Sequence, residues 1–259
     1  MGEPAAADAT ARFSDRVEDY IRYRPGYPRE LLDLLRRDCG LLDESVIADI
    51  GCGPGNLAIL FLENGNPVFG VEPNDAMRTA GEQALRRFPR FQVSDGRAEN
   101  TGLPSSSVDF ITVGQAFHWF EPAATRAEFH RILKPGGWVA LVWNERRDGA
   151  SEFSDAYEQI LLRYGTNYSA IRQSRGDEIS IRSFFGDNGV KTATFTHAQV
   201  FDFDGLRGRL LSSSYAPQSG QPGHDDMLAD LRAIFDRYQQ AGVVRFEYQT
   251  SMFYGRLNG

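Results

Sequence analysis

Hydrophobic positions follow two patterns along the first half of this chain. Five short apolar runs predict buried strands at 46–50, 67–72, 91–94, 108–113 and 138–143. Apolar residues spaced by three and four predict one helix that begins at Pro28 and three more at 56–63, 75–86 and 122–132. Asn74 is placed to cap the helix at 75–86, and Pro122 to open the helix at 122–132. Strands alternating with helices predict a doubly wound α/β sheet with parallel strands.

Beyond residue 143 the pattern changes. Aromatic and aliphatic residues recur at helical spacing between 144 and 190, which predicts a helical insertion long enough to form a cap. The remaining predicted elements are strands at 192–201 and 243–254, helices at 205–213 and 226–240, and a polar loop at 216–224. No internal repeat and no second complete domain is visible in the sequence.

The strand 46–50 runs into a turn that has glycine at alternate positions, namely Gly51, Gly53 and Gly55. Glycine suits such a turn because a backbone without Cβ takes positive φ and lets a ligand lie against it, beside the free amides of a helix start. The next strand ends in Glu72, whose carboxylate is placed to accept hydrogen bonds from two ribose hydroxyls. Strand, turn and helix in this order predict half of a Rossmann-type nucleotide-cofactor site.

The turn differs from a dinucleotide-binding fingerprint. Asn56 stands where that fingerprint has its third glycine, and Pro54 stiffens the turn, which disfavours a nicotinamide oxidoreductase. An acid, Asp49, precedes the first glycine by two residues. This arrangement resembles motif I of the class I S-adenosylmethionine-dependent methyltransferases. The cofactor of that family carries a sulfonium and an ammonium but no phosphate, and a nearby carboxylate favours positive charge.

Four further segments follow in the order that this family shows: 72–77, 96–99, 107–113 and 133–142. The resemblance implies a Rossmann-like, doubly wound sheet of seven mostly parallel strands with a closing antiparallel strand. It also implies S-adenosylmethionine as cofactor and S-adenosylhomocysteine as product. The cofactor-binding residues that it implies are Asp49, Gly51, Cys52, Gly53, Gly55, Glu72, Pro73, Met77, Ala98, Glu99 and Gln115. Arg97 stands where many relatives have an acid, so we expect the adenine to be read near Glu99 or by the backbone at Ala98.

Three shorter segments, 20–28, 97–104 and 115–120, resemble the small-molecule branch that includes trans-aconitate methyltransferase and related type 11 methyltransferases. In those enzymes the N-terminal segment folds over the cofactor pocket. The resemblance therefore implies a single methyltransferase domain over 1–259 that acts on a small-molecule methyl acceptor. Its expected parts are an N-terminal lid (1–27), a cofactor-binding core (28–143), a helical cap insertion (144–190) and C-terminal strands and helices that complete the sheet (191–259).

Methyl transfer to a nucleophile requires alignment and exclusion of water more than acid–base chemistry. A carboxylate acceptor is already ionised at neutral pH and needs only a cationic holder, for which Arg24, together with Arg22, is the candidate. A hydroxyl or amine acceptor needs a group that takes a proton, and His118, just past the fourth strand, is the candidate. We expect O-methylation of a carboxylate or hydroxyl. C-methylation of a quinone- or sterol-like lipid, and cofactor binding without turnover, remain alternatives.

Composition narrows the possible partners. The 259 residues include 28 Lys and Arg against 35 Asp and Glu, and the net charge of -7 disfavours a broad electrostatic grip on nucleic acid or an anionic membrane. Two cysteines and no export signal favour a reducing cytoplasm. The four histidines lack metal-ligand spacing, so we expect no metal. The oligomeric state is left open by the sequence.

Overall fold

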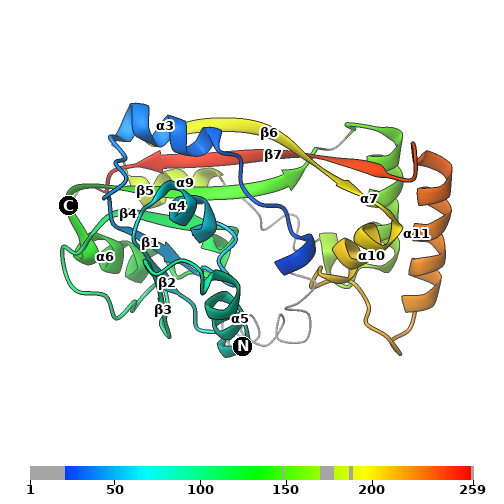
Figure 1. The fold of residues 1–259 in the computed structure, drawn as a ribbon, viewed down its shortest axis with the longest axis horizontal. Helices are drawn as coiled ribbons and strands as arrows, with labels where there is room; N and C mark the ends of the chain where they lie inside the picture. The colour runs from blue at the N-terminus through cyan, green and yellow to red at the C-terminus, as the bar shows by residue number, and fades with distance from the viewer. Residues whose placement is uncertain (1–20, 148, 170–177, 187–188, 258–259) are drawn as a thin grey trace.

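The computed structural model describes residues 21–147, 149–169, 178–186 and 189–257 (Figure 1). Most of the expected N-terminal segment, up to residue 20, lies outside these ranges. In chain order the elements are α3 (Glu30–Cys39), β1 (Ile47–Ile50), α4 (Ala58–Asn64), β2 (Val68–Val71), α5 (Asp75–Leu85), β3 (Phe91–Ser94), β4 (Val108–Gly114), the 3-10 helix η2 (Phe117–Trp119), α6 (Pro122–Ile132), β5 (Leu133–Arg146), α7 (Glu152–Tyr164), α9 (Glu178–Phe185), β6 (Lys191–Phe201), α10 (Phe203–Leu211), α11 (His224–Tyr238) and β7 (Val244–Gly255).

The seven strands form one sheet in the order β3-β2-β1-β4-β5-β7-β6. β1 pairs in parallel with β2 and β4, so that Asp49 lies opposite Gly70 on one side and Thr112 on the other. β7 is antiparallel to both of its neighbours, β5 and β6. The strand order reverses at β1 and β4, and ligands of open α/β sheets bind at such a point, beyond the strand ends. The predicted doubly wound sheet with one antiparallel closing strand is confirmed.

Helices cover both faces of this sheet because successive strand residues point to opposite sides. Ile47 and Ala140 pack with α3 and α4 in one core cluster, whereas their neighbours Ala48 and Leu141 pack with α6 and α9 in another. Two helix starts follow the sequence prediction. The Asn74 side chain accepts a hydrogen bond from the amide of Met77 at the start of α5, and Pro122 occupies the first turn of α6.

The three strands at one side of the sheet, β5, β7 and β6, are much longer than the other four. β5 has 14 residues against seven for β4, and its pairing with β7 runs from Val139–Gly255 to Arg146–Tyr248. The prediction that this strand covers only 138–143 was wrong, because antiparallel pairing continues past the end of β4. The extension carries a second lobe, in which α7, α10 and α11 pack around the far ends of β6 and β7 (Figure 1).

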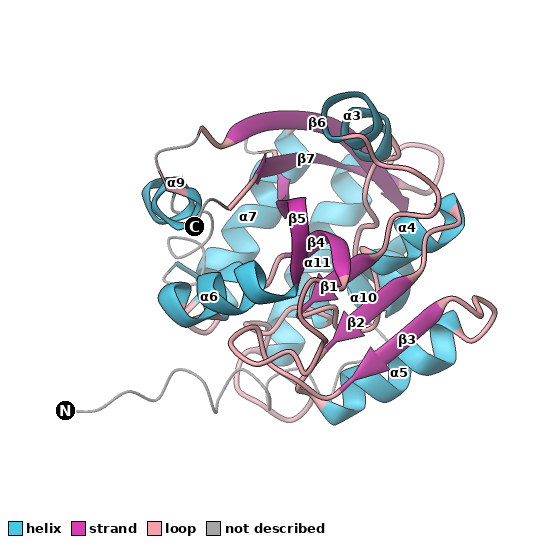
Figure 2. Ribbon diagram, turned by 90° about the vertical axis from the view of Figure 1, so that its left-hand side faces the viewer, coloured by secondary structure: helices cyan, strands magenta, loops and turns pink. Residues whose placement is uncertain are grey.

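The described helices of the insertion at 144–190 pack in two different places. Its helix α7 packs into the second lobe through Phe153, Tyr157 and Leu161. Its helix α9 packs instead on the core sheet through Ile181 and Phe184, beside α6 (Figure 2). The second lobe therefore combines one helix of the insertion with α10 and α11 from the C-terminal part of the chain. None of the described helices is long and apolar enough to cross a lipid bilayer.

Residues 21–29, the described part of the chain before α3, lie between the two lobes (Figure 1). Arg24 donates from Nη2 to the carbonyl of Ser212 at 3.1 Å, which ties the segment to the end of α10. The carbonyl of Gly26 accepts from Nδ2 of Asn144 at 2.9 Å, which ties it to β5. Tyr23 rests on α10 at Gly208, where a Cβ atom would lie 2.0 Å from the ring. The segment is thus in contact with both lobes.

Gly208→Ala tests how much the contact between Tyr23 and α10 contributes to stability. The added methyl group has no room beneath Tyr23, and inserting a methyl into a packed site costs roughly 1–3 kcal/mol. We expect the free energy of unfolding in urea to fall by about that amount. Gly26→Ala is the matched control, because no atom lies within 4 Å of the added Cβ there. Equal stability of the two variants would contradict the packing described here.

Candidate active site

The glycine turn after β1 is fixed by hydrogen bonds to the end of β2. The amides of Gly51 and Cys52 both donate to the carbonyl of Val71, at 2.8 and 3.2 Å. Gly51 and Gly53 have φ values of 66° and 54°, in the left-handed region that favours glycine. A Cβ at Gly51 would lie 2.7 Å from the Cβ of Ala116. The turn therefore presents bare backbone, as its sequence predicts.

Glu72, at the end of β2, reaches across to this turn. Its Oε2 accepts from the amide of Gly53 at 2.9 Å, and its Oε1 accepts from the amide of Asn74 at 2.9 Å. Burial raises the pKa of the carboxyl group, against the opposing effect of these two amides. One carboxylate thus shapes the turn and faces the adjoining cavity.

Gly55 has a different role from the first two glycines. It also has positive φ, at 91°, but it lines neither of the two cavities beside the turn. A Cβ at this position would lie 2.3 Å from Cδ1 of Leu85. Gly55 therefore lets the turn pack closely against the end of α5.

Asp49 is fully buried beneath the turn, with 0% of its surface exposed. Its Oδ1 accepts from the hydroxyl of Thr112 at 3.0 Å, while Oδ2 has no partner in hydrogen-bond geometry among the described residues. Burial raises the pKa of this carboxyl to about 7, although the Thr112 hydroxyl and the Ala58 amide act in the opposite direction. A buried acid with an unused oxygen is suited to a positively charged ligand.

Two cavities meet at the glycine turn. One, of about 260 Å³, lies between the turn and the second lobe, and we call it the lobe cavity. The other, of about 350 Å³, lies beyond the ends of β1 and β2, and we call it the strand-end cavity. They share as walls Gly51, Gly53, Gly114, Gln115 and Trp119. A single elongated ligand could therefore lie across the turn and enter both.

The residues predicted for cofactor binding divide between the two cavities. Glu72, Pro73, Met77, Ala98 and Glu99 line the strand-end cavity. Asp49 and Cys52 line the lobe cavity. The Oε1 atom of Glu99 accepts from the amide of Glu121 at 2.9 Å, so this carboxylate also anchors the start of α6.

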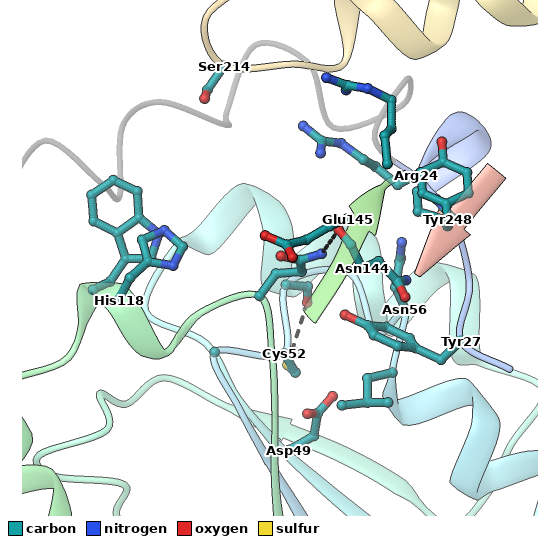
Figure 3. Close-up of a pocket in the computed structure, with 18 of the residues that line it drawn as sticks. Arg24, Tyr27, Asp49, Cys52, Asn56, His118, Asn144, Glu145, Ser214 and Tyr248 are labelled. Atoms are coloured by element: carbon teal, nitrogen blue, oxygen red, sulfur yellow. Dashed lines mark hydrogen bonds between the residues drawn. The ribbon is translucent and has the colours of Figure 1, made fainter. Parts of the chain in front are cut away.

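Gln115 and Asn144 connect the glycine turn with the second lobe. Gln115 has φ of 62°, a strained value for a residue with a side chain, and its Nε2 donates to the carbonyl of Asn144 at 2.7 Å. Asn144 is buried, and its Oδ1 accepts from the hydroxyl of Thr250 on β7 at 2.5 Å. Figure 3 shows Asn144 between Asp49 on one side of the cavity and Arg24 and Tyr248 on the other. The end of β5 is thus held in contact with the end of β4.

The proposed catalytic residues both reach the lobe cavity. Arg24 and His118 line it, the latter from η2, with its ring centroid 4.8 Å from that of Trp119. Arg22 does not line it; its guanidinium lies 5.3 Å from the centre of the Tyr23 ring. Within the described residues, no cluster of three or more His, Cys, Asp or Glu is placed to hold a metal ion.

Several polar residues of the lobe cavity were missed by reasoning from the sequence. They are Asn144, Glu145, Arg146, Tyr168, Arg209 and Tyr248. Three of them lie on the part of β5 beyond residue 143, and the others come from the second lobe. The one available signal was the dense run of polar side chains that follows the apolar strand at Asn144.

Comparisons with known proteins agree with this geometry. Residues 48–141 match the Methyltransf_11 family, whose members carry a methyltransferase domain. An uncharacterized methyltransferase of Mycobacterium tuberculosis is 37% identical over 139 residues, which cover 54% of each chain. An uncharacterized methyltransferase-like protein of Schizosaccharomyces pombe is 25% identical over 245 residues, 93% of each chain. The chain thus spans about half the length of the first of these relatives.

Solved structures show the same fold. A protein of Anaeromyxobacter dehalogenans, described as a proposed type II methyltransferase, superposes with a TM-score of 0.68 at 23% identity, over 91% of this chain and 98% of the other. This likeness shows that the chain has the same fold. The match of residues 48–141 to the methyltransferase domain family supports the resemblance to the class I S-adenosylmethionine-dependent methyltransferases that the sequence shows.

The residues around the turn fit the cofactor of this family. The turn leaves no space for a Cβ at Gly51 or Gly55. Glu72 faces one cavity with a carboxylate, and Asp49 has a buried acidic oxygen beneath the other. The Glu72 carboxylate suits the two ribose hydroxyls of an adenosine, and the Asp49 carboxylate suits an amino-acid ammonium. The two acidic residues thus match the groups that the family's cofactor carries.

The raised pKa of Asp49 predicts that cofactor binding depends on pH. A cationic ligand needs the ionised carboxylate, so the affinity for S-adenosylhomocysteine should rise with pH through about 7. We expect it to be about tenfold weaker at about pH 6 than at about pH 8. Calorimetry at a series of pH values measures this directly.

Asp49→Asn is the control for this pH dependence, because its side chain does not titrate. Its affinity should be lower and should not change between those pH values. Without ligand the sign is opposite: a carboxyl whose pKa rises from 3.8 to about 7 on folding costs stability as the pH increases through that interval. A pH-dependent affinity in Asp49→Asn would assign the effect to another group.

Proposed function

We propose that this chain transfers the methyl group of S-adenosylmethionine to an oxygen atom of a small-molecule acceptor held in the lobe cavity. The observation that carries the proposal is the meeting of two cavities at the glycine turn. Glu72 lines the strand-end cavity, and the lobe cavity is lined by Asp49 beneath the turn and by three arginines, Arg24, Arg146 and Arg209. The reacting methyl of a cofactor lying across the turn would face the lobe cavity. The strand-end cavity would take the adenosine.

When bound, the cofactor supplies an electrophilic methyl carbon: the acceptor oxygen bonds to it while the carbon–sulfur bond breaks and its electron pair stays on sulfur. The chain's own task is then to orient the acceptor and exclude water. Arg24, tied to Ser212, and the N-terminal segment around it are placed to close the lobe cavity. His118 would take a proton only if the acceptor were a hydroxyl.

A C-methyltransferase acting on a quinone- or sterol-like lipid is the rival within the same family. Such an acceptor needs an apolar pocket, whereas Arg24, Arg146 and Arg209 all line the lobe cavity. A carboxylate or hydroxyl acceptor fits those side chains better. We therefore favour an acidic small molecule.

Cofactor binding is tested first. S-Adenosylhomocysteine should raise the midpoint of thermal unfolding, and NAD should not. Glu72→Gln should weaken this binding about tenfold to a hundredfold, because a hydrogen bond to a charged group contributes roughly 1.5–3 kcal/mol. Glu63→Gln, on α4 and outside both cavities, is the matched control. Protection by NAD alone would exclude the proposed function.

Turnover is tested by the release of S-adenosylhomocysteine in a screen of small carboxylic acids and phenols. With a carboxylic acid acceptor and saturating cofactor, kcat should be flat across neutral pH, because the acceptor is ionised and no base is needed. His118→Gln should then lower kcat less than about tenfold, whereas loss of a general base costs about 10²- to 10⁴-fold. A large loss would instead assign a hydroxyl acceptor, and no turnover with any compound would favour binding without catalysis.

A further inference from the structure

Arg209 is a buried arginine that faces the lobe cavity. It lies on α10, only 4% of its surface is exposed, and it lines the cavity together with the glycine turn. Its Nε donates to the hydroxyl of Tyr248 at 3.2 Å, and its Nη1 donates to the hydroxyl of Ser213 at 3.3 Å. Its Nη2 donates to no described residue. Two long bonds to neutral oxygens thus hold the guanidinium in place.

No carboxylate of the described chain forms an ion pair with Arg209. Its neighbour in the cavity, Arg146, differs in this respect, because its Nη2 lies 2.9 Å from Oε2 of Glu158. Around Arg209 the nearby groups are the phenols of Tyr157, Tyr215 and Tyr248, and the charge of Arg146 opposes its own. Glu145 and Asp49 line the same cavity but do not pair with it.

A buried charge without a partner of opposite sign is costly to the folded protein, and buried charges are normally paired. The Arg209 guanidinium on this wall of the cavity is therefore incompletely satisfied by the described chain. A bound anion would satisfy it.

We infer that Arg209 is a positioning and specificity-determining residue that binds a carboxylate group of the methyl acceptor. This inference rests on the proposed function, since it identifies the chemical class of the acceptor for the same cavity. Arg209, rather than Arg24, is the main holder, because Arg24 already donates to the Ser212 carbonyl.

The geometry favours a carboxylate. The guanidinium is planar and presents a fork of donors that matches the two oxygens of a carboxylate. Tyr248 and Ser213 orient this fork through Nε and Nη1, so its remaining edge is directed by the protein and not by solvent. Burial in a low-dielectric wall strengthens the attraction for the anion. An acceptor without negative charge lacks this electrostatic attraction to the guanidinium.

The alternative role for Arg209 is structural, as a bridge between α10 and β7. The two roles predict different effects of Arg209→Met, which keeps an unbranched apolar side chain in place of the arginine stem and removes the charged guanidinium. A structural bridge predicts a lower midpoint of thermal unfolding without ligand. An uncompensated charge kept for binding predicts an equal or higher midpoint, because its removal relieves a buried charge.

The test uses full-length protein saturated with S-adenosylhomocysteine, to which succinate or citrate is added at constant ionic strength. Dimethyl succinate serves as the neutral analogue and inorganic phosphate as a different anion. Calorimetry and thermal unfolding should detect binding of at least one carboxylate by the wild type. Arg209→Met should weaken that binding at least tenfold and leave S-adenosylhomocysteine binding unchanged. Arg232→Met, an exposed arginine on α11 paired with Asp236, should behave as wild type.

Arg209→Lys keeps the charge but not the fork, and it should bind the carboxylate at least fivefold more weakly; it decides the matter if the methionine variant does not fold. Carboxylate binding within twofold of wild type in Arg209→Met or Arg209→Lys would overturn the inference. Binding of phosphate alone, of dimethyl succinate equally well, or of no carboxylate by the wild type would do the same. Failure of the wild type to bind S-adenosylhomocysteine would instead remove the proposed function.

Discussion

The pairing of β5 with β7 determines where both halves of the site lie. β1 ends at the glycine turn and β4 ends beside it at Gly114, but the antiparallel pair of β5 and β7 continues as far as Arg146 and Tyr248. Antiparallel pairing needs no crossover helix, so the ribbon can project freely beyond the sheet. The second lobe packs on this projection, and the lobe cavity is the space between that lobe and the turn. Without the long ribbon, the cofactor side of the site would face solvent.

Two buried charges of opposite sign face the same cavity from the two lobes. Asp49 lies beneath the turn and Arg209 lies on α10, and neither pairs with the other. Both are costly for the isolated fold because burial disfavours an unpaired charge. Under the proposed function, complementary ligands would offset each cost separately, since S-adenosylmethionine has an ammonium and the proposed acceptor has a carboxylate.

Reasoning from the sequence recovered the core fold and the bare glycine turn, because these depend on local patterns. The glycines, Asp49 and Glu72 can be recognised from their spacing along a short stretch of chain. The start of α5 can be recognised because the side chain of Asn74 caps it. The lobe cavity could not be recovered in this way. Its walls come from β5, α10 and β7, which meet only through tertiary pairing, and a strand that is apolar up to residue 143 gives no sign that pairing continues beyond it.

Gln115 has a wider effect than its place in one wall suggests. It directly follows the last residue of β4, and its side chain donates to the carbonyl of Asn144 on β5. Gln115 therefore lines both cavities and contacts the β5–β7 pair. Two ligands that share such a wall have linked affinities. Thermodynamic reciprocity then requires that, if the first ligand changes the affinity for the second by some factor, the second ligand changes the affinity for the first by the same factor. The order in which cofactor and acceptor enter therefore cannot alter the stability of the ternary complex, only the rate at which it is reached.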